Sequence, residues 1–450
     1  MVDFSKRLKL AEEIANKLSI DSIDYSFLGH NPLPLKGVKY YWKKFFEICS
    51  EKNINVPIDF YTHIPFCKSR CKYCLLFSSA DLSQEKYDCY YEYISDYLDY
   101  FKDIFKDVKF RHFFVGGGSP NALPNSILYK ILKKQHYVYD FRYSNVERAI
   151  EINPSIFNIE FLDIVNQFNF NRISMGVQSF LDETISEQNR GYVDLECVKD
   201  IYSNIKTKTS VQEVNLDFII GLPDEDEKII MDSINKAISL GVETITIYTL
   251  HQSMDNSLFF ITGLDIQRLK NLYDSIASSV SHVYDFKDAS PKHYPYPTCV
   301  VLTKKGHNNI HKYNVSNTLK RSIFSLGPSS QGIIYGILNY KHSSKFFESF
   351  SDSEILDAKR VSKNDKQFIY ISSSLFDGKI LKDDFYQKFS VEFSERYPNE
   401  VSYLINEGLL VEDKNSYIWN NPDIQKSLTF SLLFLDENAL TNILNQNWPT

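Results

Sequence analysis

The stretch that decides the fold is residues 61–77, YTHIPFCKSRCKYCLLF, which follows an apolar, β-branched run. It places Cys67, Cys71 and Cys74 in the spacing C-x3-C-x2-C. Three thiolates this close in sequence can converge on one inorganic centre, but a closed zinc site or a complete cubane takes four ligands from protein. A cluster held by three cysteines leaves one iron free to bind something else. The alternatives are three unrelated thiols or a zinc site completed by His63, because thiolates are soft ligands for either metal.

Length and composition indicate a folded chain with a sizeable core. The chain has 450 residues, 43% of them hydrophobic, and a formal charge of −7, which argues against nucleic acid as the main partner. The N-terminus lacks the apolar segment of a signal peptide, and no apolar run reaches the ~18 residues of a membrane span. Seven cysteines, an odd number, favour reduced thiols and metal ligation over disulfides. We therefore expect a cytoplasmic protein with no membrane partner.

From residue 56 onward, strand-like and helix-like runs alternate, which indicates βα units and a parallel sheet. Six such units are too few for a closed eight-stranded barrel. The sequence therefore predicts an α/β fold, an open partial (β/α)6 parallel barrel, with the chemistry at the carboxyl ends of the strands. The expected strands lie near 57–64, 109–115, 146–152, 170–177, 211–220 and 243–250.

The segments that flank this barrel have a different pattern. Residues 1–55 read as a mostly helical N-terminal extension with a Pro/Gly break near Pro32 and Pro34. After residue 281 the alternation gives way to short strand-like pieces, and the last hundred residues are mainly helical. We therefore expect an extension at 1–55, a barrel at 56–281 and a smaller mixed and helical C-terminal domain at 282–450.

A glycine cluster follows the second expected strand, in the sequence Phe113-Phe114-Val115-Gly116-Gly117-Gly118-Ser119-Pro120. The chain has only 16 glycines, so three in a row indicate a backbone that approaches something closely or takes positive φ. A tight turn explains one or two of them. We expect a small-molecule contact here, such as the amino group of an amino-acid ligand.

Charged residues also occur inside apolar strands, where they cost free energy unless they are paired or functional. Glu151 ends the third strand, and Asp217 lies within the fifth. The alternatives are an outward-facing Glu151 and a structural pair of Asp217 with Arg190 or Arg172. Gln178 stands where the fourth strand passes into a loop.

Taken together, these motifs resemble the radical S-adenosylmethionine (SAM) superfamily. They are most similar to the group that contains oxygen-independent coproporphyrinogen III oxidase, the related haem chaperone and radical SAM methylases of the same architecture. The likeness covers roughly residues 56–335. The matching pieces, in the family's order, are HIPFC-x3-C-x-Y-C, GGGSP, EINP, NRISMGVQSF, NLDFIIGLP and, more weakly, SLGPSS at 325–330.

The resemblance implies a set of roles. The three cysteines would ligate a [4Fe-4S] cluster that chelates SAM, which is cleaved to a 5′-deoxyadenosyl radical after an electron arrives from a flavodoxin- or ferredoxin-type donor. The catalytic positions would be Tyr61 and Glu151, and the substrate a tetrapyrrole or haem. The residues that would bind one or two SAM molecules are Tyr61, Tyr73, Gly117, Gly118, Ser119, Glu151, Gln178, Arg190 and Asp217.

The sequence also departs from the family patterns. Leu75-Leu76 follow the third cysteine, where the oxidase has Gly-Cys and the chaperone Asp-Phe, and Ser119 replaces the family's Thr. Three functions stay open: an oxidoreductase acting on a tetrapyrrole, a C-methylase that uses two SAM molecules, and a haem-binding chaperone. The sequence identifies neither the substrate, the electron donor, the oligomeric state nor the role of residues 346–450.

Overall fold

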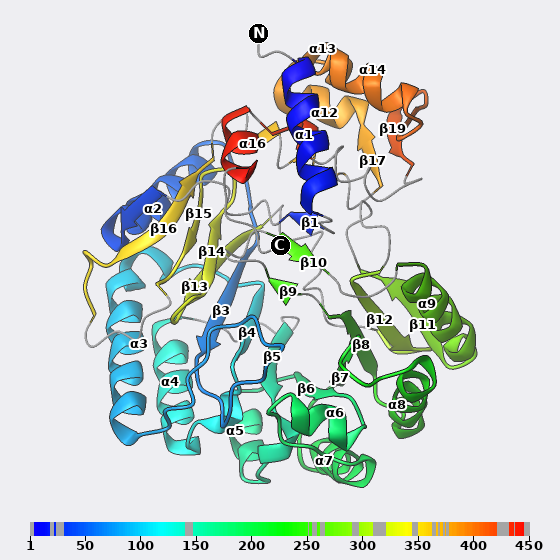
Figure 1. The fold of residues 1–450 in the computed structure, drawn as a ribbon. Coiled ribbons are helices and arrows are strands. Elements are labelled where there is room, and N and C mark those ends of the chain that lie inside the picture. The colour runs from blue at the N-terminus through cyan, green and yellow to red at the C-terminus, as the bar shows by residue number, and fades with distance from the viewer. Residues whose placement is uncertain are drawn as a thin grey trace.

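The computed structural model describes the greater part of the chain (Figure 1). The described residues are 4–18, 22–23, 31–139, 147–250, 252–253, 259–261, 266–289, 297–308, 321–343, 350–361, 366–367, 370–371, 374, 378–420, 432–435 and 437–444.

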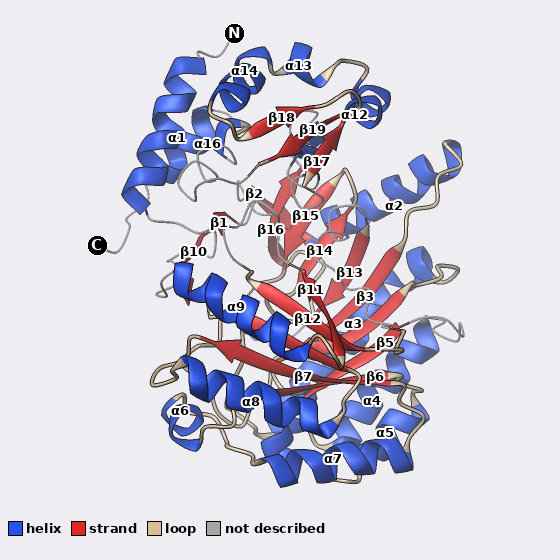
Figure 2. Ribbon diagram, turned by 90° about the vertical axis from the view of Figure 1, so that its right-hand side faces the viewer, coloured by secondary structure: helices blue, strands red, loops and turns tan. Residues whose placement is uncertain are grey.

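The six expected strands are present and run parallel to one another, in the spatial order in which they occur in the chain. Helices connect them and cover one face of the sheet (Figures 1 and 2). This confirms the predicted α/β fold with a parallel sheet. The strands are β3 (Ile58–Ile64), β4 (His112–Gly117), β5 (Glu147–Ile152), β6 (Arg172–Gln178), β7 (Glu213–Ile220) and β8 (Thr244–Thr249). The helices are α3 (Gln84–Phe105), α4 (Asn125–Val138), α5 (Phe161–Gln167), α6 (Asp182–Glu187), α7 (Leu195–Lys208), α8 (Glu227–Leu240) and α9 (Ile266–Val280).

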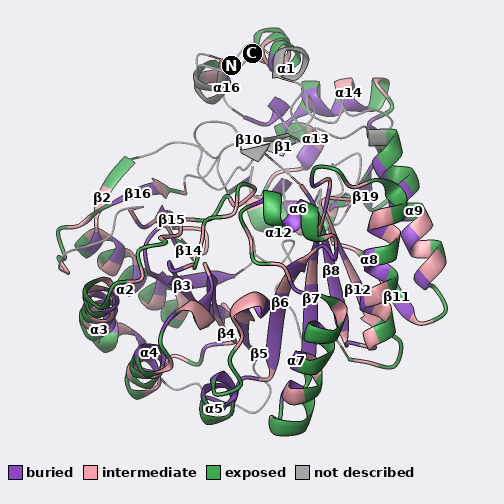
Figure 3. Cartoon of the chain, turned by 60° about the horizontal axis from the view of Figure 1, so that its bottom comes forward, coloured by how far each residue is buried: buried purple, intermediate pink, exposed green. Residues whose placement is uncertain are grey.

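The alternation along each strand explains how the sheet is built. Strand β3 reads IDFYTHI, so Phe60 and Ile64 face the helices while Asp59 and Tyr61 face the other side. Phe60 packs against other aromatic rings, including Phe113 and Phe324, in the main core. Figure 3 shows the strands buried and the outer surfaces of the helices exposed. The apolar core therefore lies between sheet and helices, and the polar residues line the barrel interior.

Buried ion pairs occupy the amino ends of the strands. Arg172 on β6 donates to Glu213 on β7 at 2.8 Å, and both side chains are buried. Asp59 on β3 lies between Arg111 at 3.1 Å and Arg321 at 2.6 Å. Breaking a buried pair by removing one partner typically costs about 3–5 kcal/mol. These pairs hold the floor of the barrel together and leave the carboxyl ends of the strands for chemistry.

The sheet extends beyond the six expected strands. A further parallel strand, β13 (Ser322–Leu326), pairs with β3, and antiparallel strands continue both edges. The described sheet has β11 and β2 at its two ends, and no pairing between them closes it. The additional strands are β11 (Tyr284–Asp288), β12 (Cys299–Lys304), β14 (Gln331–Ile334), β15 (Leu338–Lys341), β16 (Ile355–Arg360) and β2 (Asn31–Pro34).

The two N-terminal helices pack against different parts of the molecule. Helix α2 (Leu35–Glu51) joins the barrel core through Trp42 and Phe45, whereas α1 (Phe4–Leu18) packs against α16 (Glu437–Leu444) (Figure 1). Arg7 on α1 forms an ion pair with Glu400. The strands that follow residue 281 join the same sheet as the barrel strands, so the sheet continues past the expected boundary. The division at residues 55 and 281 stays a prediction.

The C-terminal region is mixed, with helices around a small three-stranded sheet of order β17-β19-β18. Its own apolar core contains Phe385, Phe393 and Leu404 as well as Ile14 from α1. Its elements are β17 (Lys379–Leu381), α12 (Lys382–Phe389), α13 (Phe393–Arg396), α14 (Pro398–Asn406), β18 (Leu410–Glu412) and β19 (Ser416–Trp419). Outside this region, three short strands form a separate sheet of order β1-β10-β9: β1 (Ser22–Ile23), β9 (Gln252–Ser253) and β10 (Phe259–Ile261).

Candidate functional site

A cavity of about 560 Å³ lies at the carboxyl ends of the parallel strands. Its volume falls within the usual range of small-molecule sites, about 300–1,000 Å³. Every site residue expected from the sequence lines it; Gly116, the first glycine of the cluster, is not among the lining residues. The expected residues are Tyr61, Cys67, Cys71, Tyr73, Cys74, Gly117, Gly118, Ser119, Glu151, Gln178, Arg190 and Asp217.

The loop with the three cysteines leaves β3 and is fixed at two places. The Cys67 N–H donates to the Ser79 carbonyl at 3.0 Å, which closes the loop on itself. Beyond the end of α6, Gln188 and Asn189 hold its outer part: the Gln188 carbonyl accepts from the Lys72 N–H at 3.1 Å, and the Asn189 carbonyl accepts from the Ser69 hydroxyl at 2.7 Å. The three thiols are half-buried, and all face the cavity.

The geometry of the donor atoms distinguishes a zinc site from an iron–sulfur cluster. Among the described residues, no three His, Cys, Asp or Glu side chains are close enough together to hold a single metal ion. His63 is buried and bonds to the Phe77 carbonyl at 2.8 Å and to the Tyr61 hydroxyl at 3.2 Å. Burial lowers the pKa of His63 to about 4. A zinc ion completed by His63 does not fit this arrangement. Three soft thiols that line one cavity fit a multi-iron cluster, whose ligands bind separate irons.

The glycine cluster is explained first by close packing within the protein. A Cβ on Gly117 would lie 2.4 Å from Nδ1 of His63, and its φ of +108° disfavours other residues. A Cβ on Gly118 would lie 2.6 Å from the Phe66 carbonyl oxygen. The Gly118 N–H donates to the Ile64 carbonyl at 2.7 Å, so this amide already has a partner. Packing alone requires these glycines, and a ligand contact at Gly117 and Gly118 stays a prediction.

Glu151 faces the cavity, which excludes the alternative of an outward-facing side chain on β5. Its Oε2 accepts a hydrogen bond from the Gly117 N–H at 3.0 Å, so it also orients the glycine segment. Burial, and next the nearby charge of Asp217, raise the pKa of Glu151 to about 7. A carboxyl of this kind exchanges its proton near neutral pH, as general acids and bases do.

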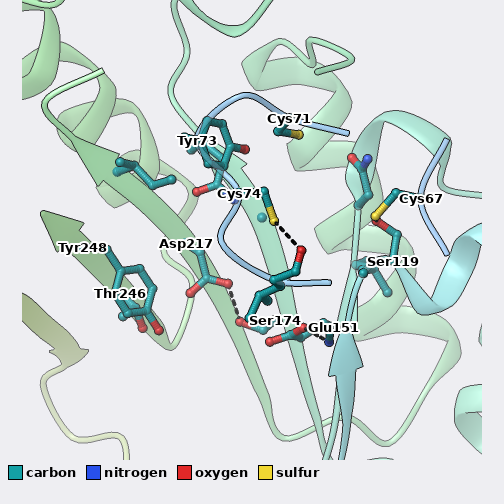
Figure 4. Close-up of a pocket in the computed structure, with 18 of the residues that line it drawn as sticks. Cys67, Cys71, Tyr73, Cys74, Ser119, Glu151, Ser174, Asp217, Thr246 and Tyr248 are labelled. Carbon is teal, nitrogen blue, oxygen red and sulfur yellow. Dashed lines mark hydrogen bonds between the residues drawn. The ribbon is translucent and has the colours of Figure 1, made fainter. Parts of the chain in front are cut away.

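Asp217 is held in a hydrogen-bond network on β6 and β7. Its Oδ2 accepts from the Ser174 hydroxyl at 2.7 Å (Figure 4). Its Oδ1 accepts from the Asn215 amide at 2.8 Å. The arginines considered as its partners are engaged elsewhere: Arg172 pairs with Glu213, and Arg190 bonds to the Gly176 carbonyl. The network fixes the Asp217 carboxylate at the cavity surface.

Arg190 and Gln178 come together where β6 ends. Gln178 has a φ of +72°, and the pairing of β6 with β7 is irregular at this point. The Arg190 guanidinium lies 3.8 Å from the Cys71 sulfur and 3.5 Å from Oδ1 of Asn153. Arg190 therefore lies beside Cys71 as well as in the cavity, which the sequence did not indicate.

The wall opposite the cysteine loop, apart from Asp217, was missed by the sequence analysis. It is formed by residues of β7, β8, β11 and β12, including Tyr248, Thr246 and Cys299, and Figure 4 shows Tyr248 and Thr246 across the cavity from Cys67. The alternation in β8 (TITIYT) places Thr246 and Tyr248 on one face, which was the available signal. The sequence offered no such signal for β11 and β12, because they follow the last βα unit and carry no family motif.

Comparison with known proteins supports the family. Residues 61–237 match the model of the radical SAM superfamily. The chain is 26% identical to the heme chaperone HemW of Bacillus subtilis over 59% of this chain and 64% of that protein. It is 25% identical to the oxygen-independent coproporphyrinogen III oxidase of Helicobacter pylori, over 45% of this chain and 44% of that protein. Each alignment thus spans less than two thirds of the relative.

The solved structure of the coproporphyrinogen III oxidase HemN from Escherichia coli has a similar fold. It superimposes with a TM-score of 0.70 at 16% identity and covers 84% of this chain and 90% of that one. Within the described part of the chain, no helix is both long enough and apolar enough to cross a membrane.

Proposed function

Because this chain belongs to the radical SAM superfamily, in the group that includes HemW and oxygen-independent coproporphyrinogen III oxidase, we propose that it is an oxidoreductase acting on a tetrapyrrole. The observation that carries the proposal is the shared cavity. The three thiols, the glycine segment and two acidic side chains from β5 and β7 all line it. A redox centre, SAM and a substrate can therefore meet in one cavity.

The chain's own residues have defined tasks in this proposal. Cys67, Cys71 and Cys74 hold a [4Fe-4S] cluster, and the segment Gly117 to Ser119 contacts the methionine part of SAM. Tyr61, which stacks on Phe114, forms the floor beneath them. When bound, the cluster and SAM supply a 5′-deoxyadenosyl radical that removes hydrogen from the substrate. The walls of the cavity orient the reactants and keep competing hydrogen donors away.

Glu151 has two tasks: it orients the glycine segment, and it can hold or release a proton during catalysis. Because its Oε2 accepts the Gly117 N–H, its position fixes the backbone that faces SAM. The raised pKa allows it to hold or release a proton near neutral pH. We assign Glu151 and Tyr61 to the catalytic end of the cavity.

The relatives' names point to a tetrapyrrole substrate, and oxidative decarboxylation of propionate side chains is the corresponding reaction. The test is anaerobic incubation of the reconstituted protein with SAM, reductant and coproporphyrinogen III. We expect 5′-deoxyadenosine and a decarboxylated porphyrinogen, and neither product with Cys74→Ala. Haem binding without any 5′-deoxyadenosine would contradict the enzyme and favour a chaperone.

A second SAM is proposed from the position of Asp217. Ser174 and Asn215 hold its carboxylate at the cavity surface, away from the cysteine loop. Thr246 and Tyr248 line the cavity together with Asp217, so this wall offers several hydrogen-bonding groups to a second polar ligand. Equilibrium binding should show two SAM sites, one of them weakened by Asp217→Ala with the cluster spectrum unchanged.

Product analysis of the anaerobic incubation decides between oxidation and methyl transfer. A C-methylase consumes one SAM for the radical and another for the methyl group, so S-adenosylhomocysteine accompanies 5′-deoxyadenosine. An oxidase gives 5′-deoxyadenosine without S-adenosylhomocysteine. A single SAM site with substrate present would exclude both the methylase and a two-SAM oxidase.

A further inference from the structure

The cavity wall opposite the cysteine loop carries a cation to which the proposed function gives no task. Lys287 on β11 lines the cavity, and its side chain is exposed. Within the described part of the chain, the other cations that line the cavity are Arg172 and Arg190. Arg172 pairs with Glu213, and Arg190 donates to the Gly176 carbonyl. The Lys287 ammonium, in contrast, forms no ion pair with any described residue.

The strand register explains why Lys287 faces the cavity. Asp217 of β7 lies opposite Thr246 of β8, and Thr246 lies opposite Val301 of β12. Val301 in turn lies opposite Lys287 of β11, and all four residues line the cavity. Side chains at paired positions project from the same face of a sheet. These residues therefore form one row across the wall, with a carboxylate at one end and an ammonium at the other.

The two charges of this row are too far apart to neutralise one another. The strand order β11-β12-β8-β7 puts three strand spacings between them. Neighbouring strands lie about 4.8 Å apart, so the backbones of Asp217 and Lys287 are separated by about 14 Å along the sheet. Ser174 and Asn215 hold the Asp217 carboxylate at its own end of the row. The Lys287 ammonium can therefore bind an anionic group of a ligand that lies along the wall.

The surroundings of Lys287 indicate the kind of anion. Val301 beside it and Ala289 after the end of β11 both line the cavity with apolar side chains. The Ala289 N–H donates to the Cys299 carbonyl at 2.9 Å, so this amide already has a partner. Phosphate sites bring several backbone N–H groups or arginines together. A single ammonium beside apolar surface instead suits a carboxylate on a largely apolar molecule.

We propose that Lys287 forms a carboxylate-binding subsite, which holds one end of the ligand on the wall across the cavity from Cys67 (Figure 4). The inference rests on the proposed function, which offers two sources of a carboxylate: a propionate side chain of a tetrapyrrole and the methionine part of a second SAM. A propionate bound by Lys287 is not the one that reacts, because the cysteines lie on the other side of the cavity. Lys287 is thus a positioning residue that sets the orientation of the ligand.

The test is equilibrium binding of two probes, coproporphyrin III and SAM, to the cluster-loaded protein. Lys287→Met keeps an apolar stem and removes the charge. It should weaken the binding of coproporphyrin III roughly tenfold, the effect of losing one hydrogen bond to a charged group. Lys287→Arg should restore most of this affinity. The matched control is Lys305→Met, because Lys305 is exposed and follows β12 at the end away from Cys299, outside the cavity. This control should change the affinity less than about twofold.

The probe that Lys287→Met weakens identifies the source of the carboxylate: coproporphyrin III for a propionate, or SAM at its second site for a methionine carboxylate. Unchanged binding of both probes, equal weakening by Lys305→Met, or no recovery in Lys287→Arg would overturn the proposal. Only preparations of equal iron content are compared. Cleavage of SAM with excess dithionite tests the proposed function separately: its absence in the wild type would defeat the enzyme assignment, whereas the binding measurements need no turnover.

Discussion

Replacing Glu151 by Gln should change how the stability of the cluster-free chain depends on pH. The raised pKa means that the folded chain disfavours the ionised carboxylate. Below pH 4.5, Glu151 is protonated in the folded and unfolded states and has no effect. As the pH rises from 4.5 to about 7, the unfolded chain releases the proton while the folded chain keeps it, so the wild type loses stability.

The size of this loss follows from the shifted pKa. Each tenfold difference in proton affinity is worth about 1.4 kcal/mol, so a carboxyl with a pKa of about 7 in place of 4.5 destabilises the folded state by about 3 kcal/mol above pH 7. The Gln side chain cannot ionise, and its oxygen can still accept the Gly117 N–H. The free energy of unfolding of Glu151→Gln, relative to wild type, should therefore rise by about 3 kcal/mol between pH 4.5 and pH 8.

Urea unfolding at several pH values measures this difference directly. The matched control is Glu187→Gln, which removes an exposed carboxyl on α6 and reports the background of the substitution. A difference between wild type and Glu151→Gln that is independent of pH, or that falls as the pH rises, would refute the reasoning. Either result would mean that Glu151 is solvated or paired in the folded chain.

Two further substitutions test the packing and electrostatics around the same carboxyl. Gly118→Ala should destabilise the chain by about 1–3 kcal/mol and reduce iron loading, because the new Cβ would lie 2.6 Å from the Phe66 carbonyl oxygen. Gly408→Ala is the control for iron analysis: its φ of +70° strains any side chain, but no atom lies near the new Cβ, so it should destabilise the chain and leave the iron content unchanged. Equal iron content in Gly118→Ala and wild type would contradict the packing argument. Asp217→Asn should lower the pKa of Glu151, because the Asp217 charge helps to raise it. The pH-dependent loss of stability should then be smaller than in wild type by the same unfolding assay, and an unchanged profile would show that the two carboxyls do not interact.

The parallel barrel could be predicted from the sequence because its signals are local. The alternation of IDFYTHI in β3 and the helix-length segments between strands are read directly from the chain. The strand β13 was not foreseen as a barrel strand, because its pairing with β3 joins residues more than 250 positions apart. The packing of α1 against α16 is a contact of the same kind, and no local pattern indicates it.

The candidate site was predictable where residue types and spacing restrict the chemistry, as they do for Cys67, Cys71 and Cys74. The reason for the glycines could not be predicted, because a nearby protein atom and a bound ligand would each exclude a Cβ. Only the structure shows that His63 lies against Gly117 and the Phe66 carbonyl against Gly118. Asp217 was expected to need a partner, but Ser174 and Asn215 could not be identified as its donors without the strand register.

The most direct test of the account is whether SAM cleavage depends on these three cysteines and on no others. After anaerobic reconstitution, the reduced wild type should bind about four irons per chain and convert SAM to 5′-deoxyadenosine. Alanine at Cys67, Cys71 or Cys74 should abolish the brown colour and the cleavage, whereas single changes of Cys49, Cys89, Cys197 or Cys299 should leave the cluster intact. Iron loading that requires one of those four, or 5′-deoxyadenosine formed by Cys67→Ala, would contradict the account.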